Sequence, residues 1–277
     1  MRSLITGGNG FIAKHLAKVL DVVEAPDRNE LDITDRDQVL KYFKENEFDY
    51  IFHLAAGATQ DGHKGKFRDI FETNVVGTVN LLEGAGQQQY KAFINTGTSS
   101  EYGSQKTDGM YEGDCPDPEF YYSGTKAATT MICQALAREE GRPIVTVRPF
   151  SIYGPGESEK RFIPTVIRCA KTGDTLDLAK GVHDWTHVED VVNGLVQIAR
   201  KAHDLKGQIV NLGTGRQMTN EDVVKTISYC MDKGIKCERV QLMREWDKQT
   251  VWRNGSDKAR DLGIEFRTFE EGIGTML

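Results

Sequence analysis

A phenol and an ammonium group lie four residues apart in the segment Tyr122-Ser123-Gly124-Thr125-Lys126. If this segment begins a helix, residues i and i+4 share one face, with β-carbons about 5–6 Å apart. A nearby ammonium lowers the pKa of a phenol, which is ordinarily about 10. Tyr122 is then suited to give or take a hydroxyl proton as a general acid–base, with Lys126 as its partner. The same spacing also arises by chance, and the alternative is a packing tyrosine beside a solvated lysine.

Hydroxyl groups gather in a second segment, Thr96-Gly97-Thr98-Ser99-Ser100-Glu101-Tyr102-Gly103. This segment follows an apolar strand predicted at 92–96, and ligands of parallel sheets bind beyond the carboxyl ends of the strands. The hydroxyls are therefore placed to hydrogen-bond a reacting oxygen. The alternative is a turn whose hydroxyls cap their own backbone.

A glycine-rich loop, Thr6-Gly7-Gly8-Asn9-Gly10-Phe11-Ile12-Ala13, lies between a predicted strand and a predicted helix. Gly7 permits a tight turn, Gly10 lets the backbone approach a pyrophosphate, and Ala13 is small enough for close packing of helix on sheet. The helix N-terminus adds N–H donors and partial positive charge. This context predicts a nicotinamide dinucleotide site and, with the acid–base pair, hydride transfer to or from a carbon that bears oxygen.

The residues near the end of the second predicted strand leave the choice of dinucleotide open. An acid there, such as Glu24, favours NAD because it can bind the ribose 2′-hydroxyl. An arginine, such as Arg28, accommodates the 2′-phosphate of NADP. Arg28 is equally consistent with a solvated loop charge.

Short apolar stretches alternate with longer amphipathic ones, which predicts an α/β protein with a Rossmann-type doubly wound parallel sheet. Strands are predicted at 2–6, 22–25, 50–54, 92–96, 144–147 and 208–212, and helices near 11–20, 36–46, 70–86, 123–140 and 187–201. Right-handed crossovers then bring the glycine loop and the hydroxyl-rich segment to the same edge of the sheet.

The alternation loosens after Pro149 and the break at Gly154-Pro155-Gly156, and 157–185 carries few strand signals. We therefore predict a dinucleotide-binding domain of residues 1–156 and about 186–213. Residues 157–185 and 214–277 are predicted to form a small C-terminal α/β substrate-binding lobe. A small molecule is expected in a cleft between the two.

Composition limits the classes of function. The formal net charge is -6, which argues against a nucleic-acid partner because phosphates usually call for a basic face. No window approaches the roughly 18 apolar residues of a membrane span. The five cysteines form no C-x-x-C pair and no zinc spacing, so we expect reduced thiols and no metal. The N-terminus runs directly into a strand without a signal peptide, and we expect a cytoplasmic protein.

Together these residues resemble the extended short-chain dehydrogenase/reductase family, in its NAD(P)-dependent nucleotide-sugar epimerase, dehydratase and reductase branch. The similarity covers nearly the whole chain. Beyond the glycine loop and the Tyr122/Lys126 pair, the matching motifs are His53-Leu54-Ala55-Ala56, Asn74, Thr98 to Gly103, Arg148-Pro149-Phe150-Ser151-Ile152-Tyr153-Gly154-Pro155, Arg161-Phe162-Ile163-Pro164, Asp184 to Val191 and Asn211-Leu212-Gly213-Thr214-Gly215.

The resemblance implies that Thr98, Tyr122 and Lys126 are catalytic. Asn74 matches an asparagine at a helix bend, and Arg28 matches the 2′-phosphate arginine of the GDP-fucose synthase type, which favours NADP with NAD possible. The cofactor-binding residues implied are Gly7, Asn9, Gly10, Phe11, Ile12, Arg28, Asp32, Ile33, Leu54, Ala55, Ala56, Asn74, Tyr122, Lys126, Pro149, Phe150 and Ile152.

This chain departs from the family pattern at three positions. Sugar 4,6-dehydratases carry Asp-Glu directly after the catalytic threonine, whereas this chain has Ser99 and Ser100, so dehydration is not expected. The fucose synthase type has a cysteine where Ser100 stands, so 3,5-epimerisation is not expected either. His183 replaces an arginine that binds the substrate diphosphate in the family.

Hydride chemistry at C4 of a nucleotide-activated sugar remains. Our prediction is an oxidoreductase, a 4-keto-6-deoxy-sugar reductase that uses NADPH, on the strength of Arg28 and the compact C-terminal lobe. The alternatives are an NAD-dependent C4 epimerase of the UDP-glucose 4-epimerase type and a protein that senses the dinucleotide without turnover. Retention of Thr98, Tyr122 and Lys126 argues against the sensor.

The substrate-binding residues predicted are Thr98, Ser99, Ser100, Arg161, His183 and Arg253. The two arginines are included because an acidic protein must supply positive charge locally to a diphosphate; two ordinary surface arginines are the alternative. The helices near 70–86 and 123–140 match those through which the family commonly dimerises. The second carries more apolar surface than one core stripe requires, and we predict a homodimer.

Overall fold

The computed structural model describes residues 2–57, 66–104, 108–241 and 249–277. The chain divides into two compact units. The first comprises Met1–Gly103, Cys115–Arg148 and Val192–Val210, and the second comprises Ser104–Asp114, Pro149–Val191 and Asn211–Leu277. None of the helices in the described ranges is both long and apolar enough to cross a membrane.

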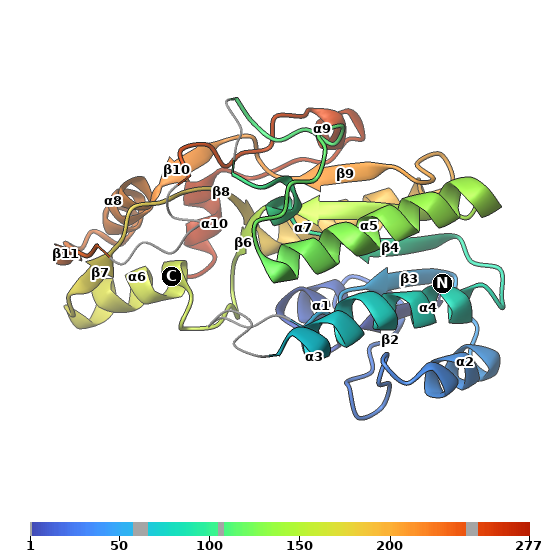
Figure 1. The fold of residues 1–277 in the computed structure, drawn as a ribbon. Coiled ribbons are helices and arrows are strands. Elements are labelled where there is room, and N and C mark those ends of the chain that lie inside the picture. The colour runs from blue at the N-terminus through green and yellow to red at the C-terminus, as the bar shows by residue number, and fades with distance from the viewer. Residues whose placement is uncertain (1, 58–65, 105–107, 242–248) are drawn as a thin grey trace. The chain divides into compact units, whose positions relative to one another are not determined.

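The first unit is built on a six-stranded sheet (Figure 1). Its spatial order is β2 (Val22–Glu24), β1 (Arg2–Thr6), β3 (Tyr50–His53), β4 (Ala92–Thr96), β5 (Ile144–Pro149) and β9 (Ile209–Leu212). Strands β1 to β5 pair in parallel, which confirms the predicted fold class. The order reverses between β1 and β3, so a ligand site is expected beyond the carboxyl ends of these two strands.

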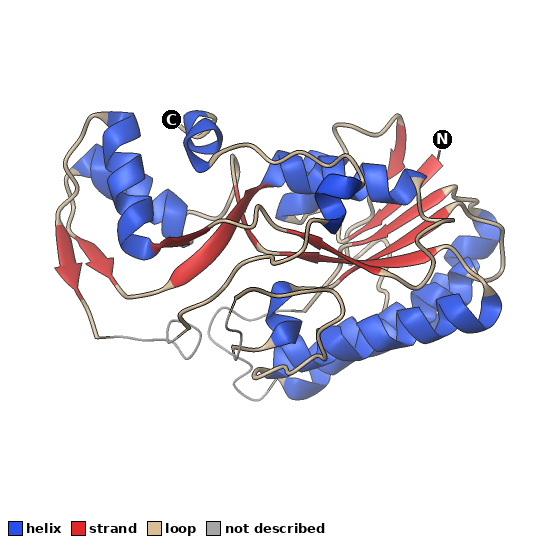
Figure 2. Ribbon diagram, turned by 90° about the horizontal axis from the view of Figure 1, so that it is seen from above, coloured by secondary structure: helices blue, strands red, loops and turns tan. Residues whose placement is uncertain are grey.

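Helices lie on both faces of this sheet (Figure 2). They are α1 (Phe11–Leu16), α2 (Arg36–Glu45), α3 (Phe67–Phe71), α4 (Gly77–Ala85), α5 (Tyr121–Glu140) and α7 (Val188–Arg200), with a 3₁₀ helix η2 at Ser99–Tyr102. One core joins α2, α4 and α5 to the sheet through residues such as Phe43, Leu81, Phe93 and Cys133, all nearly inaccessible to solvent. Burial of these apolar side chains holds α2, α4 and α5 against the sheet.

The segment predicted as one helix near 70–86 is interrupted. It begins at Phe67 as α3 and passes through a π-helical turn, η1 (Glu72–Val76), before α4. Single π-turns often mark functional positions, because they displace one side chain from the regular helical face. The displaced position here includes Asn74, which is 1% exposed.

The second unit contains two small sheets. In the first, β6 (Ser151–Tyr153) pairs in parallel with β8 (Val182–His187), and β8 pairs antiparallel with β10 (Gln217–Thr219). In the second, β7 (Leu176–Leu178) pairs in parallel with β11 (Cys237–Arg239). The helices are α6 (Phe162–Thr172), α8 (Asn220–Met231), α9 (Lys258–Asp261) and α10 (Phe269–Gly274).

The predicted boundaries at 156, about 186 and 213 correspond to 148, 192 and 210 in these units, and Ser104–Asp114, predicted in the first domain, belongs to the second unit. The first boundary lies earlier than predicted because β6 pairs with β8 of the second unit. β7 and most of β8 lie within 157–185, the segment in which the sequence carries few strand signals. The strand β8 escaped recognition because its sequence, Val182-His183-Asp184-Trp185-Thr186-His187, is largely polar and aromatic rather than apolar.

Candidate dinucleotide and catalytic site

The glycine loop is pressed against the backbone of neighbouring strands. Gly7 has φ of +75°, and a β-carbon there would lie 2.9 Å from the Cα of Ala55. A β-carbon on Gly8 would lie only 1.9 Å from the carbonyl oxygen of Ala25, and the Gly8 amide donates to the Pro26 carbonyl. Gly8 is thus as strictly required as Gly7, although its role was not predicted from the sequence.

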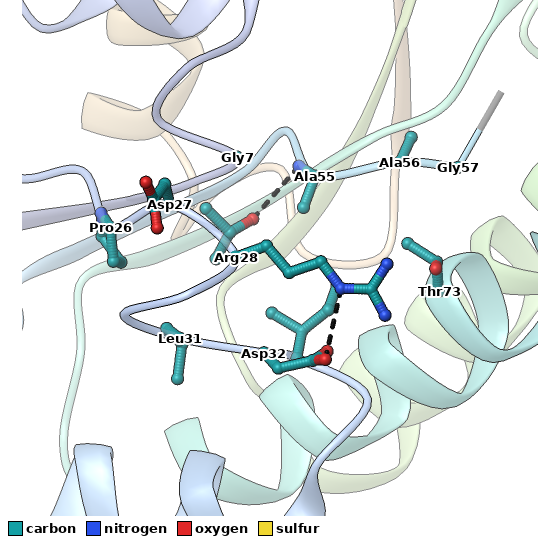
Figure 3. A pocket seen from close by; sticks show the side chains of 12 residues that line it. Gly7, Pro26, Asp27, Arg28, Leu31, Asp32, Ala55, Ala56, Gly57 and Thr73 are labelled. Carbon is teal, nitrogen blue, oxygen red and sulfur yellow. Dashed lines mark hydrogen bonds and ion pairs between the residues drawn. The ribbon is translucent and has the colours of Figure 1, made fainter. Parts of the chain in front are cut away.

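Beyond this loop lies a cavity of about 240 Å³ in the first unit, the glycine-loop pocket (Figure 3). Its position at the ends of β1 and β3 is the one that the strand order predicts. The lining residues are Thr6, Gly7, Pro26, Asp27, Arg28, Leu31, Asp32, Ile33, Ala55, Ala56, Gly57 and Thr73.

Half of that lining was anticipated from the sequence: Gly7, Arg28, Asp32, Ile33, Ala55 and Ala56. The other predicted cofactor residues of the first unit do not line this cavity: Asn9, Gly10, Phe11, Ile12, Leu54, Asn74, Tyr122 and Lys126. Pro149, Phe150 and Ile152 belong to the second unit, where Phe150 donates its amide to Leu212 and Ile152 pairs with Thr186.

Two acids and one arginine share the pocket. Nε of Arg28 lies 3.2 Å from Oδ2 of Asp32, and Figure 3 shows the Arg28 side chain reaching past Asp32 toward Thr73. Burial opposes ionisation of Asp32, but hydrogen bonds from Thr34 and from Arg28 outweigh it and hold the pKa of Asp32 below its usual value. Asp32 is therefore a fixed negative charge that orients Arg28.

Glu24, the acid considered for NAD selection, is held elsewhere. Its carboxylate pairs with Arg2 and accepts a hydrogen bond from the hydroxyl of Tyr42 at 2.7 Å. The acid that lines the pocket instead is Asp27, whose Oδ1 accepts from the Asn29 amide at 2.8 Å. Asn9 of the glycine loop reaches the other Asp27 oxygen at 3.4 Å.

Tyr122 and Lys126 lie in the first turns of α5, as the i, i+4 spacing predicts. Tyr122 is half-buried, whereas Lys126 is only 3% exposed. Burial lowers the pKa of Lys126 to about 8, and the nearby carboxylate of Glu101 partly opposes that shift. The bland alternative, a lysine on a solvated face, is therefore wrong, because Lys126 lies inside the protein.

Thr98 caps the short helix η2, with its amide bonded to Oε1 of Glu101 at 2.9 Å. Its hydroxyl lies 2.9 Å from the hydroxyl of Ser100. The hydroxyl beside that of Thr98 is therefore the one on Ser100, whereas Ser99, the next residue in sequence, is buried. Helix η2 contacts α5, which brings the Thr98 segment and the Tyr122 helix into one structure.

Sequence reasoning assigned no role to Glu101 or to the side chain of Arg148, yet they hold this arrangement. Nε of Arg148 donates to Oε2 of Glu101 at 2.9 Å, and the Thr130 hydroxyl on α5 donates to the same oxygen at 2.8 Å. The Arg148 guanidinium also lies 4.4 Å from the ring centroid of Tyr102. The sequence feature that could have indicated this pair is one acid and one arginine, each within an otherwise apolar or hydroxyl-rich segment.

The predicted substrate residues of the second unit have different surroundings. Nδ1 of His183 lies 2.9 Å from the Ser151 hydroxyl, and its ring centroid is 5.0 Å from that of Trp185. Arg161 has an exposed side chain 3.7 Å from Glu157. Arg253 is half-buried and precedes Asn254, whose amide donates to the buried carboxylate of Asp184 at 3.0 Å.

The residues fit a dinucleotide, because the glycine loop forms a cradle that side chains would fill and the pocket beside it carries polar groups at its rim. The model of the NAD dependent epimerase/dehydratase family matches residues 3–213. The chain belongs to this family. The predicted membership of the extended short-chain dehydrogenase/reductases is confirmed, and the protein is an NAD(P)-dependent enzyme.

Individual relatives are distant but span most of the chain. A probable dTDP-glucose 4,6-dehydratase of Sinorhizobium fredii is 30% identical, over 84% of this chain and 77% of its own length. The structure of the protein MoeE5 in complex with UDP-glucose and NAD is 26% identical, with a TM-score of 0.84 over 100% of this chain and 97% of that one. UDP-glucose 4-epimerase of Thermotoga maritima, at 24% identity over the same shares and a TM-score of 0.88, shows the shared fold.

Proposed function

We propose that this enzyme acts on a nucleotide-activated sugar and moves a hydride to and from C4, as an NAD-dependent C4 epimerase. The observation that carries the proposal is the buried Lys126 one turn beyond Tyr122, on a helix that Glu101 links to the Thr98 segment through Thr130. Solved relatives that bind UDP-glucose, one of them together with NAD, support the substrate class.

The chain's own residues have separate tasks in this proposal. The bound nicotinamide supplies and receives the hydride. Tyr122 removes the proton from the C4 hydroxyl during oxidation and returns it when the ketone is reduced on the opposite face. Thr98 hydrogen-bonds the reacting oxygen. Lys126, charged below pH about 8, stabilises the ionised phenol electrostatically.

The glycine loop and its pocket would hold the adenosine half of the cofactor. Gly7 and Gly8 leave the backbone open for a pyrophosphate, and Asp27 or Asp32 is available to a ribose hydroxyl. The proposed substrate contacts remain Thr98, Ser99, Ser100, Arg161, His183 and Arg253.

A second candidate is the 4-keto-6-deoxy-sugar reductase, favoured by Arg28. An arginine in this pocket provides a charged donor for the 2′-phosphate of NADP. Similarity to a probable dehydratase makes dehydration a third reaction to consider. However, Ser99 and Ser100 carry neither the acid nor the base that elimination of water requires.

We also propose a homodimer. Met131 on α5 and Val79 on α4 are 61% and 42% exposed, and an interface formed by these two helices would cover both. A monomer mass by light scattering at micromolar concentration would contradict this.

One experiment separates these functions. The purified protein is denatured, and any released dinucleotide is identified by mass spectrometry. UDP-glucose, other nucleotide sugars and their 4-keto derivatives are then assayed with NAD, with NADPH and without added cofactor. Retained NAD and C4 epimers formed without added cofactor are expected. Consumption of NADPH with a 4-ketosugar, and no epimer, would establish the reductase. Binding without any turnover would leave a sensor.

A further inference from the structure

Four buried polar side chains lie side by side across the sheet of the first unit. Thr6 on β1, His53 on β3, Asn95 on β4 and Thr146 on β5 occupy neighbouring register positions. None is more than 1% exposed. A polar group in a core costs free energy unless it is hydrogen-bonded, so apolar residues would be the ordinary choice at these positions. These polar side chains therefore indicate a role other than filling the core.

The hydrogen bonds around His53 have only one consistent direction. The Thr78 hydroxyl donates to the Asn74 carbonyl at 2.5 Å, so the same oxygen accepts from Nε2–H of His53 at 2.8 Å. Burial lowers the pKa of His53 to about 3, with a smaller contribution from Lys126, so the ring is neutral at pH 7. Its unprotonated Nδ1 then accepts from the Thr6 hydroxyl at 2.8 Å.

The hydrogen-bonded series that runs from Thr6 through His53 and Thr78 to Asn74 reaches the site at both of its ends. At one end, the Thr6 oxygen accepts from the amide of Ala55 at 3.2 Å, and both residues line the glycine-loop pocket. At the other end is Asn74 in the π-turn, whose Oδ1 accepts from the Gly57 amide at 2.7 Å. Gly57 also lines the pocket, so these hydrogen bonds hold the pocket wall at 55–57 from both sides.

From Asn74 the connection continues into α5. Nδ2 of Asn74 donates to the Thr125 hydroxyl at 2.9 Å, and that hydroxyl donates to the carbonyl of Tyr122 at 2.7 Å. The position of the first turn of α5 is thereby linked, bond by bond, to the wall of the pocket.

We propose that His53, as the neutral Nε2–H tautomer, is a positioning residue that couples the pocket wall at Ala55–Gly57 to the helix carrying Tyr122 and Lys126. This inference rests on the proposed function, in which the pocket holds the dinucleotide and Tyr122 moves the proton. His53 touches neither reacting group, and it acts through Thr6 and Thr78.

Thr78→Val tests the coupling, because it removes the acceptor of Nε2–H while keeping a β-branched side chain. The control is Thr129→Val, since Thr129 is also a buried helical threonine whose hydroxyl bonds its own helix, to the Lys126 carbonyl at 2.8 Å. Two quantities are measured for each: the dissociation constant of NAD and the single-turnover rate of hydride transfer at saturating NAD and nucleotide sugar.

The net loss of one hydrogen bond corresponds to about a twofold to tenfold effect. We expect Thr78→Val to weaken NAD binding and to slow hydride transfer by about that factor, with Thr129→Val near wild type on both. Thr78→Ser, which keeps the hydroxyl, should restore both. Thr78→Val behaving like Thr129→Val would overturn the coupling.

Nitrogen-15 NMR of labelled histidine reports the tautomer of the wild-type protein itself. The His53 ring, assigned by loss of its signals in His53→Gln, should carry its proton on Nε2 and should not titrate between pH 5 and pH 8. A proton on Nδ1, or titration near neutral pH, would overturn the proposal. A wild-type protein that shows this tautomer but binds neither NAD nor NADP would instead refute the proposed function and, with it, the coupling.

Discussion

Glu101 and Arg148 form an ion pair in which both side chains are fully buried, with Oε2 and Nη2 2.7 Å apart. The same carboxylate accepts hydrogen bonds from the Thr98 amide and from the Thr130 hydroxyl on α5. A buried pair adds little net stability over an apolar one, because both charges lose their hydration. The value of Glu101 here is positional, since it ties the turn after β4 to β5 through Arg148 and to α5 through Thr130.

Removing one partner of this pair should be costly. Glu101→Gln leaves the Arg148 guanidinium buried without a counter-charge, and we expect the free energy of unfolding to fall by about 3–5 kcal/mol. Urea denaturation measures this. Glu83→Gln, in the exposed pair of Glu83 with Arg36, is the control and should change stability very little. Similar losses in the two variants would show that the buried pair is not a special support.

Arg28 decides between the two candidate functions. If it binds a 2′-phosphate, Arg28→Ala should weaken NADP by about 1.5 kcal/mol, roughly tenfold, and leave NAD unchanged. We take the lower end for a charged hydrogen bond because the side chain is 74% exposed. Calorimetric titration of both dinucleotides measures the difference. Arg68→Ala is the matched surface control. Equal affinities for NADP in wild type and Arg28→Ala would show that Arg28 does not bind the 2′-phosphate.

The fold of the first unit could be predicted because its strands are apolar and its helices are amphipathic. The strand predicted at 92–96 coincides with β4, and the one predicted at 2–6 with β1. The same reasoning failed at β8, where burial is achieved by polar and aromatic residues. Asp184 is completely buried there. Its carboxylate accepts hydrogen bonds from the backbone amides of Thr214, Gly215 and Asn254, residues that are far away in sequence.

The candidate site shows the same limit. Tyr122 and Lys126 were found because their spacing lies within one helix, and Gly7 because its turn is local. Glu101, Arg148 and His53 have partners more than twenty residues away, which no local pattern specifies. Asp27 was overlooked because four acids, Glu24, Asp27, Glu30 and Asp32, lie at or just after the end of β2. Only the structure shows that Glu24 is bound to Arg2 and Tyr42.

Gly10 tests the glycine loop. A β-carbon there would lie 3.0 Å from the carbonyl oxygen of Gly7, and the rest of a valine would occupy the space in front of helix α1. We expect Gly10→Val to abolish dinucleotide binding because the pyrophosphate can no longer approach the backbone. Gly113→Val is the control, since nothing lies within 4 Å of its β-carbon position. A folded Gly10→Val protein with wild-type affinity would remove the site from this loop.

Glu157 should make stability depend on pH. Burial raises the pKa of this carboxyl from 4.5 to about 7, and Arg161 opposes the shift only partly. Between pH 4.5 and 7 the folded state therefore holds more protons than the unfolded state, so stability falls as pH rises through this window. The shift corresponds to roughly 3 kcal/mol. Glu157→Gln should stabilise the protein at pH 8 by up to about that amount and flatten the slope in thermal or urea denaturation. Asp174→Asn, at the exposed carboxylate paired with Arg168, should leave the slope unchanged.

In the proposed mechanism Tyr122 moves the proton, and its neighbour Tyr121 provides a control of the same residue type. Tyr122→Phe removes only the phenolic oxygen, so the fold and NAD affinity should be retained while turnover falls by about 10²–10⁴-fold, the scale of general acid–base catalysis. Tyr121→Phe removes an equivalent oxygen, one that donates to the Phe67 carbonyl at 3.1 Å, and should keep turnover near wild type. The measurement is kcat on the nucleotide sugar identified by the substrate panel. A large loss in Tyr121→Phe with near wild-type turnover in Tyr122→Phe would transfer the acid–base role to Tyr121. Comparable large losses in both would instead mean that the first turn of α5 has been disturbed, which NAD affinity and denaturation of each variant would reveal.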